Sequence, residues 1–346
     1  MKRQGRREDI SEFMLTAGKE MCARLPNRLC IGLVVLACLG FAPEHSWPAR
    51  GGIHGEPMRP FPVVGALGGT LPAAVADSRR AGPALRGDDA WAIHARAPAG
   101  VLESPLRVLM IGNSFTRGSF LPLRLWRMAT TEGKPTYLAW SAPSGYSLQR
   151  HRRIPESVGL VDEGDWDVVI LQEFSTRPTD GLGRPGRFKK DATWWYDRVK
   201  TSSPSARVIL YETWARHADH EVYPRSFRSP LQMQRELRRH YADCASEHIP
   251  RHRRWRGKTL SRVEVAPVGE ACLSHVRSEH PRRLHHTDLY HAGPSGAYLS
   301  ALVLYGSIYR APVVGVDSQE FTPDLARHLQ RTARDAMRRR PSVYSS

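Results

Sequence analysis

Residues 106–116 read LRVLMIGNSFT, and this stretch decides the fold. Residues 107–111 form an almost continuous apolar run, which is typical of a strand covered on both faces. Gly112 ends the run, and Asn113, Ser114 and Phe115 follow at once. A serine on a tight turn from a central strand into a helix is presented at the carboxyl edge of a sheet, beside backbone N–H groups. The same pattern is typical of an ordinary helix cap, so this stretch alone leaves both interpretations open.

Similar apolar runs recur along the chain and alternate with amphipathic segments. We expect further strands at residues 137–140, 167–171, 207–211 and 263–266, and helices at 120–131, 229–241 and 295–309. This alternation predicts parallel strands joined by helical crossovers. The expected fold class is therefore α/β, a three-layer α/β/α sandwich with a mostly parallel, flavodoxin-like sheet. In such sheets the functional site lies in the loops that follow the carboxyl ends of the strands.

Three further polar residues fall at such positions. Gln172 directly follows the apolar run at 167–171, and its side-chain amide can donate an N–H to a developing oxyanion. Asp288 and His291 lie three residues apart on a loop before the apolar helix at 295–309. A carboxylate so placed can hold an imidazole whose other nitrogen reaches a serine elsewhere in the fold. Each feature taken singly is more often an ordinary polar loop, but the order Ser, Asp, His indicates nucleophilic catalysis.

In combination these motifs resemble the SGNH (GDSL-type) hydrolase superfamily, and within it a bacterial branch of unknown function with I-G-N-S-F-T and L-Q-E motifs. The resemblance spans residues 106–316. It rests on four blocks, namely residues 112–116, residues 144–148 (SGYSL), Gln172, and Asp288 with His291. Two positions depart from the usual superfamily pattern, because Asn113 stands for Asp and Gln172 for Asn.

The resemblance implies a role for each block. Ser114 would be the nucleophile, His291 its general base, and Asp288 the carboxylate that orients His291. The oxyanion hole would consist of the backbone N–H groups of Ser114 and Gly145 and the amide of Gln172. Because glutamine is one methylene longer than asparagine, the contribution of Gln172 is the weakest part of this assignment.

The expected activity is that of a serine hydrolase of carboxylic ester bonds, with an acyl or acetyl group on a carbohydrate, or a small-molecule ester, as its substrate. The mechanism requires no metal and no other cofactor. Two alternatives stay open. One is a non-catalytic protein that binds an anionic envelope polymer, and the other is a degenerate hydrolase that binds its ligand without turnover.

Charge is the feature of the composition that first suggests a nucleic-acid partner. The chain has 346 residues, with 51 Lys+Arg against 34 Asp+Glu, a net charge of +17. Residues 1–28, 215–262 and 324–340 carry +14 of this excess, so the remainder is nearly neutral. We therefore expect weak contact with an anionic polymer or membrane surface, and no sequence-specific nucleic-acid recognition.

The N-terminal third differs in composition from the rest of the chain. Residues 29–42 (LCIGLVVLACLGFA) follow basic residues and are too short for a membrane span of about 20 residues, which predicts a signal peptide or an N-terminal anchor over residues 1–42. Residues 43–104 contain eight Pro and nine Gly, which is typical of a disordered linker. The expected organisation is an exported protein with a hydrolase domain at 105–317, a basic insert at 215–262 and a basic helical tail at 318–346.

Cysteines and histidines admit more than one interpretation. Cys244 and Cys272 could pair after export or simply be buried, and the sequence does not choose between these. Two histidine groups suggest zinc, namely His217 and His220 with Glu221, and His275, His280, His285 and His286. Neither group has a recognised ligand spacing, so we expect solvated loop histidines.

Overall fold

The computed structural model describes residues 90–94, 104–257, 263–278 and 282–339. The predicted leader at 1–42 and most of the predicted linker lie outside the described residues. No helix in the described part of the chain is both long and apolar enough to cross a membrane.

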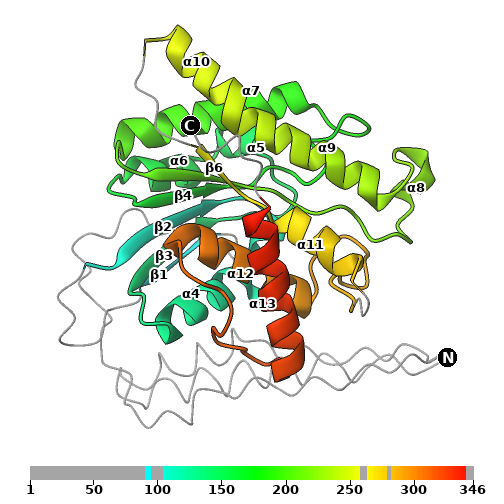
Figure 1. Cartoon of the computed structure of the whole chain (residues 1–346). Coiled ribbons are helices and arrows are strands. Elements are labelled where there is room, and N and C mark those ends of the chain that lie inside the picture. The colour runs from blue at the N-terminus through cyan, green and yellow to red at the C-terminus, as the bar shows by residue number, and fades with distance from the viewer. Residues whose placement is uncertain (1–89, 95–103, 258–262, 279–281, 340–346) are drawn as a thin grey trace, which may run out of the picture. The chain divides into compact units, whose positions relative to one another are not determined.

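A six-stranded sheet forms the centre of the fold, in the order β1-β3-β2-β4-β5-β6 (Figure 1). Its strands are β1 (Ala90–His94), β2 (Leu106–Ile111), β3 (Thr136–Ser141), β4 (Val168–Leu171), β5 (Arg207–Tyr211) and β6 (Val263–Ala266). Only β1 runs antiparallel, against β3, and β2 to β6 form a parallel sheet. The predicted strands of the parallel sheet are confirmed to within a residue or two, because continuous apolar runs suit strands that are buried on both faces.

Helices cover both faces of the sheet and make three layers, as Figure 1 shows. One face packs on α4 (Leu121–Thr131), α11 (Val268–Val276), α12 (Pro294–Tyr309) and α13 (Pro323–Arg338). The other packs on α5 (Leu148–His151), α6 (Pro155–Asp162), α7 (Pro185–Ser202), α9 (Pro230–Asp243), the π-helical turn η3 (Cys244–His248) and α10 (Ile249–Trp255). Alternate residues of each strand point to opposite faces, for example Met110 into the first core and Leu109 into the second. The expected three-layer α/β/α class is confirmed.

Two segments, residues 90–94 and the basic tail, differ from the organisation expected from sequence, whereas the basic insert lies within the domain as expected and contains the predicted helix at 229–241. Residues 90–94 fall in the predicted linker but form β1, because the free edge of β3 offers main-chain partners whatever the surrounding composition. The basic insert contains α9 and α10, whose apolar side chains Tyr241 and Ile249 are fully buried in the second core. The basic tail contains α13, which buries Leu329 and Ala333 in the first core. Both basic segments therefore contribute to the cores of the domain, and most of their arginines are exposed, although Arg253 is buried.

The two cysteines of the described domain are free and buried. Cys272 lies in the first core and Cys244 in the second, on opposite faces of the sheet. Of the two interpretations left open, burial is the one that the structure shows, and the sheet between the two thiols explains why they do not pair.

Candidate active site

Ser114 lies at the carboxyl end of β2, as the first residue of the short helix α3 (Ser114–Arg117). Asn113 caps this helix, because its Oδ1 accepts the Phe115 N–H at 3.0 Å. Gly112 turns the chain in a space that admits no side chain. A Cβ there would lie 2.1 Å from Thr116 Oγ1 and 2.6 Å from Gln172 Oε1. The turn therefore holds Ser114 at the edge of the sheet with its hydroxyl partly accessible.

His291 and Asp288 reach Ser114 from the far end of the chain. The Nε2 atom of His291 lies 2.8 Å from Ser114 Oγ, and its Nδ1 atom lies 2.7 Å from Asp288 Oδ2. A carboxylate can only accept a hydrogen bond, so Nδ1 carries the proton and donates it to Asp288. Nε2 is then the acceptor for the Ser114 hydroxyl, which is the tautomer that a general base requires.

Asp288 is held in its ionised form. Partial burial by itself would raise the pKa of Asp288, but hydrogen bonds from the His291 side chain and from the backbone N–H groups of Tyr290 and His291 lower the pKa to about 2. The two backbone groups lie 3.1 Å and 3.0 Å from Asp288 Oδ1. The carboxylate is therefore charged at any pH at which the enzyme would work.

The loop that carries Asp288 and His291 is pinned by its own backbone. The N–H of His286 donates to the carbonyl of His291 at 2.8 Å, and His285 forms a β-bridge with Ala292. Leu289, at the tip of the loop, has a positive φ of 68°. This closed loop fixes the direction of the imidazole before any substrate arrives, which is the preorganisation that catalysis by proton transfer needs.

The backbone N–H groups of Ser114 and Gly145 have no hydrogen-bond acceptor within the described residues. Gly145 lies on the loop after β3 with a φ of +73°, a conformation that favours glycine. Asn113 joins this loop to the nucleophile turn, since its Nδ2 donates to the Tyr146 carbonyl at 2.7 Å. Two free donors beside an accessible serine are what an oxyanion hole requires.

Gln172 differs from its expected role. The side chain is completely buried, and its Oε1 accepts the Asn113 N–H and the Thr116 hydroxyl, each at 2.9 Å. Its Nε2 donates to the backbone carbonyl of Glu173. A substrate oxygen cannot contact a fully buried amide, so Gln172 does not complete the oxyanion hole here. The extra methylene instead places the amide under the turn, where it binds the residues on both sides of Ser114.

Gln172→Ala is expected to lower the free energy of unfolding, because it leaves the buried N–H of Asn113 and the hydroxyl of Thr116 without an acceptor. Each unsatisfied donor costs about 1–3 kcal/mol. Urea unfolding of Gln172→Ala and of the wild type measures this loss. Unchanged stability in Gln172→Ala together with a loss of roughly 100-fold or more in kcat would contradict this arrangement and return Gln172 to the oxyanion hole.

His151 contacts the turn that carries Ser114, and no sequence motif selects it. The ring is fully buried, with Nε2 2.6 Å from the Gly112 carbonyl and Nδ1 2.8 Å from Ser157 Oγ. Burial lowers the pKa of His151 to about 4, against the opposing effect of the Gly112 carbonyl. The ring is therefore neutral at pH 7, with Nε2–H donating to Gly112.

His151 is expected to make the fold less stable as the pH falls. Its pKa is depressed in the folded state, so between the unfolded value near 6.5 and about 4 the unfolded chain binds more protons and stability is lost. From pH 7.5 to pH 4.5 the free energy of unfolding of the wild type should fall by about 2–3 kcal/mol more than that of His151→Gln. Urea unfolding of both proteins at both pH values checks this. An equal pH dependence in the two proteins would show that His151 is not the group responsible.

An aromatic wall lies beside the three residues. Phe115 stacks on Trp214 with ring centroids 4.6 Å apart, and the Tyr290 and His291 rings are 4.0 Å apart. Arg216 packs on this wall, with its guanidinium carbon 4.5 Å from the centre of the Tyr290 ring. Phe115 follows β2, Trp214 and Arg216 follow β5, and Tyr290 lies on the loop of Asp288 and His291, so the edge of the sheet brings them together.

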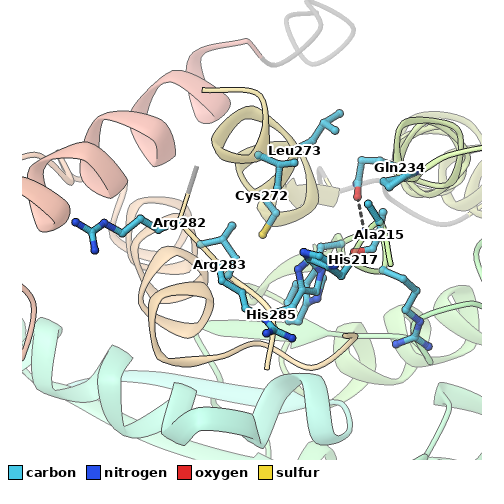
Figure 2. Close-up of a pocket in the computed structure, with 14 residues that line it drawn as sticks. Ala215, His217, Gln234, Cys272, Leu273, Arg282, Arg283 and His285 are labelled. Atoms are coloured by element: carbon cyan, nitrogen blue, oxygen red, sulfur yellow. Dashed lines mark hydrogen bonds between the residues drawn. The ribbon is translucent and has the colours of Figure 1, made fainter. Parts of the chain in front are cut away.

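A cavity of about 300 Å³ adjoins Trp214, and Figure 2 shows residues that line it. Trp214 and Arg216 line both the cavity and the site, whereas Ser114, Asp288 and His291 do not line the cavity. Figure 2 shows the hydrogen bond from the Ala215 N–H to Gln234 Oε1, at 2.8 Å, which joins the segment after β5 to α9. Ser114 is thus not among the residues that line this cavity.

The histidines around this cavity are not all solvated as expected. His285 is buried, its Nε2 donates to the Ala215 carbonyl at 2.9 Å, and burial lowers its pKa to about 4. His275 is completely buried in α11 and contacts His328 at 3.0 Å. His280 lies outside the described residues. Within the described ranges, no group of three or more His, Cys, Asp or Glu side chains is placed to hold a metal ion.

Sequence reasoning missed Glu173 as well as His151. Glu173 is completely buried, and its Oε1 accepts the N–H groups of Leu148 and Phe174 at 3.2 Å and 2.7 Å. Burial raises the pKa of Glu173 to about 7, against the opposing effects of Phe174 N–H and Arg177. A carboxylate directly after a buried strand, next to Gln172, was the available signal. Glu173 ties the loop of Gly145 to the end of β4.

No protein-family model and no curated protein matches the chain. Solved structures do. A DUF4886 family protein from Bacteroides uniformis is 16% identical with a TM-score of 0.51, over 68% of this chain and 96% of that one. An SGNH hydrolase candidate from Slackia heliotrinireducens is 22% identical with a TM-score of 0.47, over 59% and 100%. An acetylxylan esterase from Geobacillus stearothermophilus is 13% identical with a TM-score of 0.40, over 60% and 94%.

These identities are low, so the likeness concerns the fold and not the reaction. The parallel sheet, its two helical layers and the site at its carboxyl edge agree with it. The chain therefore has the same type of fold as the DUF4886 family protein from Bacteroides uniformis.

Proposed function

We propose that the chain is a serine hydrolase that cleaves carboxylic esters through an acyl-enzyme intermediate. One observation carries the proposal, which is the unbroken hydrogen-bond chain from Ser114 to His291 to Asp288 at the edge of the sheet. An ionised carboxylate, an oriented imidazole and a serine are together the requirements of this chemistry. The fold and the free N–H groups of Ser114 and Gly145 support it.

In the first half of the reaction Ser114 Oγ attacks the ester carbonyl while its proton moves to His291 Nε2. The carbonyl oxygen becomes an oxyanion, which the N–H groups of Ser114 and Gly145 would stabilise. Asp288 stabilises the imidazolium through Nδ1. The tetrahedral intermediate then collapses, the bond to the alcohol oxygen breaks, and His291 returns the proton to that oxygen.

In the second half a water molecule replaces the alcohol. His291 takes a proton from the water, whose oxygen attacks the acyl carbon, and the same two N–H groups stabilise the second oxyanion. Collapse releases the carboxylic acid and restores the Ser114 hydroxyl. These steps consume one water and need no redox partner.

The substrate class that we propose is an acyl or acetyl ester of a carbohydrate. This substrate class is supported by the resemblance of the sequence motifs to the SGNH hydrolases. In such proteins the fold and the triad do not by themselves define the substrate. We also propose that the protein is exported, because the apolar run at 29–42 is typical of a signal peptide or an N-terminal anchor. An exported hydrolase would meet envelope or extracellular saccharides.

The alternative of a non-catalytic anion-binding protein has less support. Several arginines of the 215–262 segment are engaged in ion pairs, such as Arg238 with Glu270 at 3.2 Å and Arg253 with Asp197 at 2.9 Å. Charges neutralised in this way attract a polyanion weakly. Salt-dependent retention on heparin that is unchanged in Ser114→Ala, without any hydrolysis, would favour this alternative.

The test uses the purified full-length protein on p-nitrophenyl acetate and on acetylated sugars, together with labelling by a fluorophosphonate probe. We expect hydrolysis of the aryl ester and covalent labelling at Ser114. A protein that neither hydrolyses any of these esters above background nor takes up the probe would refute the hydrolase proposal. Labelling without hydrolysis would instead identify a degenerate hydrolase.

A further inference from the structure

Arg216 is a cation at the candidate active site that the reaction described above does not use. It follows β5, and its guanidinium carbon lies 4.5 Å from the centre of the Tyr290 ring and 5.6 Å from that of Phe115. Phe115 directly follows Ser114, and Tyr290 directly precedes His291. The guanidinium therefore packs against the neighbours of both the nucleophile and the base.

The position of Arg216 is fixed on two sides. Its Nη2 donates to Ser175 Oγ at 3.1 Å, and its backbone carbonyl accepts the Tyr223 hydroxyl at 3.2 Å. Burial lowers the pKa of Arg216 to about 10, so it is charged at neutral pH. A fixed, charged side chain at this place is suited to recognise a ligand of opposite charge.

Arg216 has no ionic partner in the described part of the chain. Its Nη1 is buried without a hydrogen-bond partner. The nearby carboxylate of Asp288 is already occupied by His291 and two backbone N–H groups. Guanidinium groups that are largely removed from water are normally paired with an anion. Arg216 as a whole is only partly buried and also lines a cavity, so part of its surface is open to a substrate group.

The side of the site on which Arg216 lies indicates which part of the substrate it meets. His291 gives its proton to the alcohol oxygen, so the alcohol part of the ester lies against His291 and Tyr290. The acyl oxygen faces the N–H groups of Ser114 and Gly145 instead. Arg216 stacks on Tyr290 and is therefore on the alcohol side.

We propose that Arg216 determines specificity for esters whose alcohol part carries an anionic group, a carboxylate or a phosphate, close to the scissile bond. Acylated acidic sugars are alcohols of this kind. This inference rests on the proposed hydrolase function and names its substrate class. A planar guanidinium binds either anion in a bidentate manner, which is why both chemistries are included.

The test compares matched acetyl esters that differ only in the charged group. 4-Acetoxybenzoate is anionic at pH 7, 4-acetoxybenzamide is its neutral analogue, and 4-acetoxyphenyl phosphate supplies the phosphate arm. The variants are Arg216→Gln and Arg216→Lys. Arg251→Gln is the control, because Arg251 is 79% exposed on α10 and pairs with Glu247 at 3.6 Å.

We expect Arg216→Gln to lower kcat/KM for the better of the two anionic esters by about 10- to 100-fold, chiefly through KM, because one charge-assisted contact to the substrate is lost. The neutral amide should change by less than about threefold. Arg216→Lys should recover part of the loss, and Arg251→Gln should resemble the wild type. The anion with the higher kcat/KM in the wild type is the one the site prefers.

Two results would overturn the inference while leaving the hydrolase proposal intact. Equal losses on charged and neutral esters, with a shifted pH profile, would show that Arg216 acts on the His291–Asp288 pair. If the wild type had the same kcat/KM for both anionic esters as for the neutral ester, the site would not distinguish charged from neutral substrates.

Calorimetric binding of the alcohol products gives a readout that does not depend on turnover. The wild type should bind 4-hydroxybenzoate or 4-hydroxyphenyl phosphate more tightly than 4-hydroxybenzamide, and Arg216→Gln should lose that difference. If no ester is hydrolysed but this selective binding is found, the hydrolase proposal fails and the anion site stands. If binding is also unselective, both fail.

Discussion

Ser114→Ala is expected to reduce kcat for ester hydrolysis by about 10⁴-fold or more, since the loss of a serine nucleophile removes the acyl-enzyme route altogether. The residual rate would come from the oxyanion donors and substrate binding alone. The free energy of unfolding should change little, because the Ser114 hydroxyl is partly accessible and its one side-chain contact in the described residues is with His291. Initial rates on p-nitrophenyl acetate and urea unfolding measure the two quantities.

Ser144→Ala is the matched control for this variant. Ser144 is an exposed serine on the loop after β3. Its hydroxyl accepts a hydrogen bond from Arg117 at 2.7 Å but contacts neither His291 nor Asp288. It should keep activity within a few-fold of the wild type and keep fluorophosphonate labelling. If Ser114→Ala retained wild-type turnover, the nucleophile would have to be another residue, and the proposed mechanism would be wrong.

Asp288→Asn is expected to lower kcat by about 10⁴-fold, the size of loss that this replacement causes in a serine protease triad. The new amide can donate to His291 Nδ1, which would move the ring proton to Nε2 and leave no acceptor for the Ser114 hydroxyl. The carbonyl oxygen of the amide can still accept the N–H groups of Tyr290 and His291, so the loop should keep its shape. The defect would therefore be one of protonation and not of position.

Three measurements separate these causes. Urea unfolding should give nearly the same stability for Asp288→Asn and the wild type, and KM should change little while kcat falls. The rate of fluorophosphonate labelling should fall with kcat, because the nucleophile is no longer deprotonated. If Asp288→Asn kept kcat within tenfold of the wild type, Asp288 would not orient the base, and its contact with His291 would be only structural.

The parallel sheet was largely predictable from the sequence. The runs that became β2, β4 and β5 are mostly Val, Ile and Leu, with Arg107 and Arg207 near the starts of β2 and β5, and a strand covered on both faces needs apolar residues along most of its length. The edge strand β1 was not predicted from the sequence. A strand that joins a sheet through one neighbour is stabilised mainly by main-chain hydrogen bonds, which leave little trace in the sequence.

The candidate site was predictable only in part. Ser114, Asp288 and His291 were selected from motifs, and the structure places them within hydrogen-bond distance, although their catalytic roles stay predictions. Gln172 was selected too, but the direction of its side-chain amide depends on its extra methylene and on its hydrogen bonds with Asn113 and Thr116. His151 and Arg216 were passed over, because their significance comes from neighbours that are distant in sequence, Gly112 for the first and Tyr290 for the second.

The sequence by itself determined the layered α/β architecture and the edge of the sheet at which the polar loops gather, because hydrophobic periodicity and turn residues act locally. The tertiary structure was needed to show that the basic tail packs into the core, that the two cysteines lie on opposite faces of the sheet, and that the side chain of Gln172 is buried. Each of these depends on which surfaces meet when the chain closes, and contacts between residues far apart in the chain leave no local pattern to read.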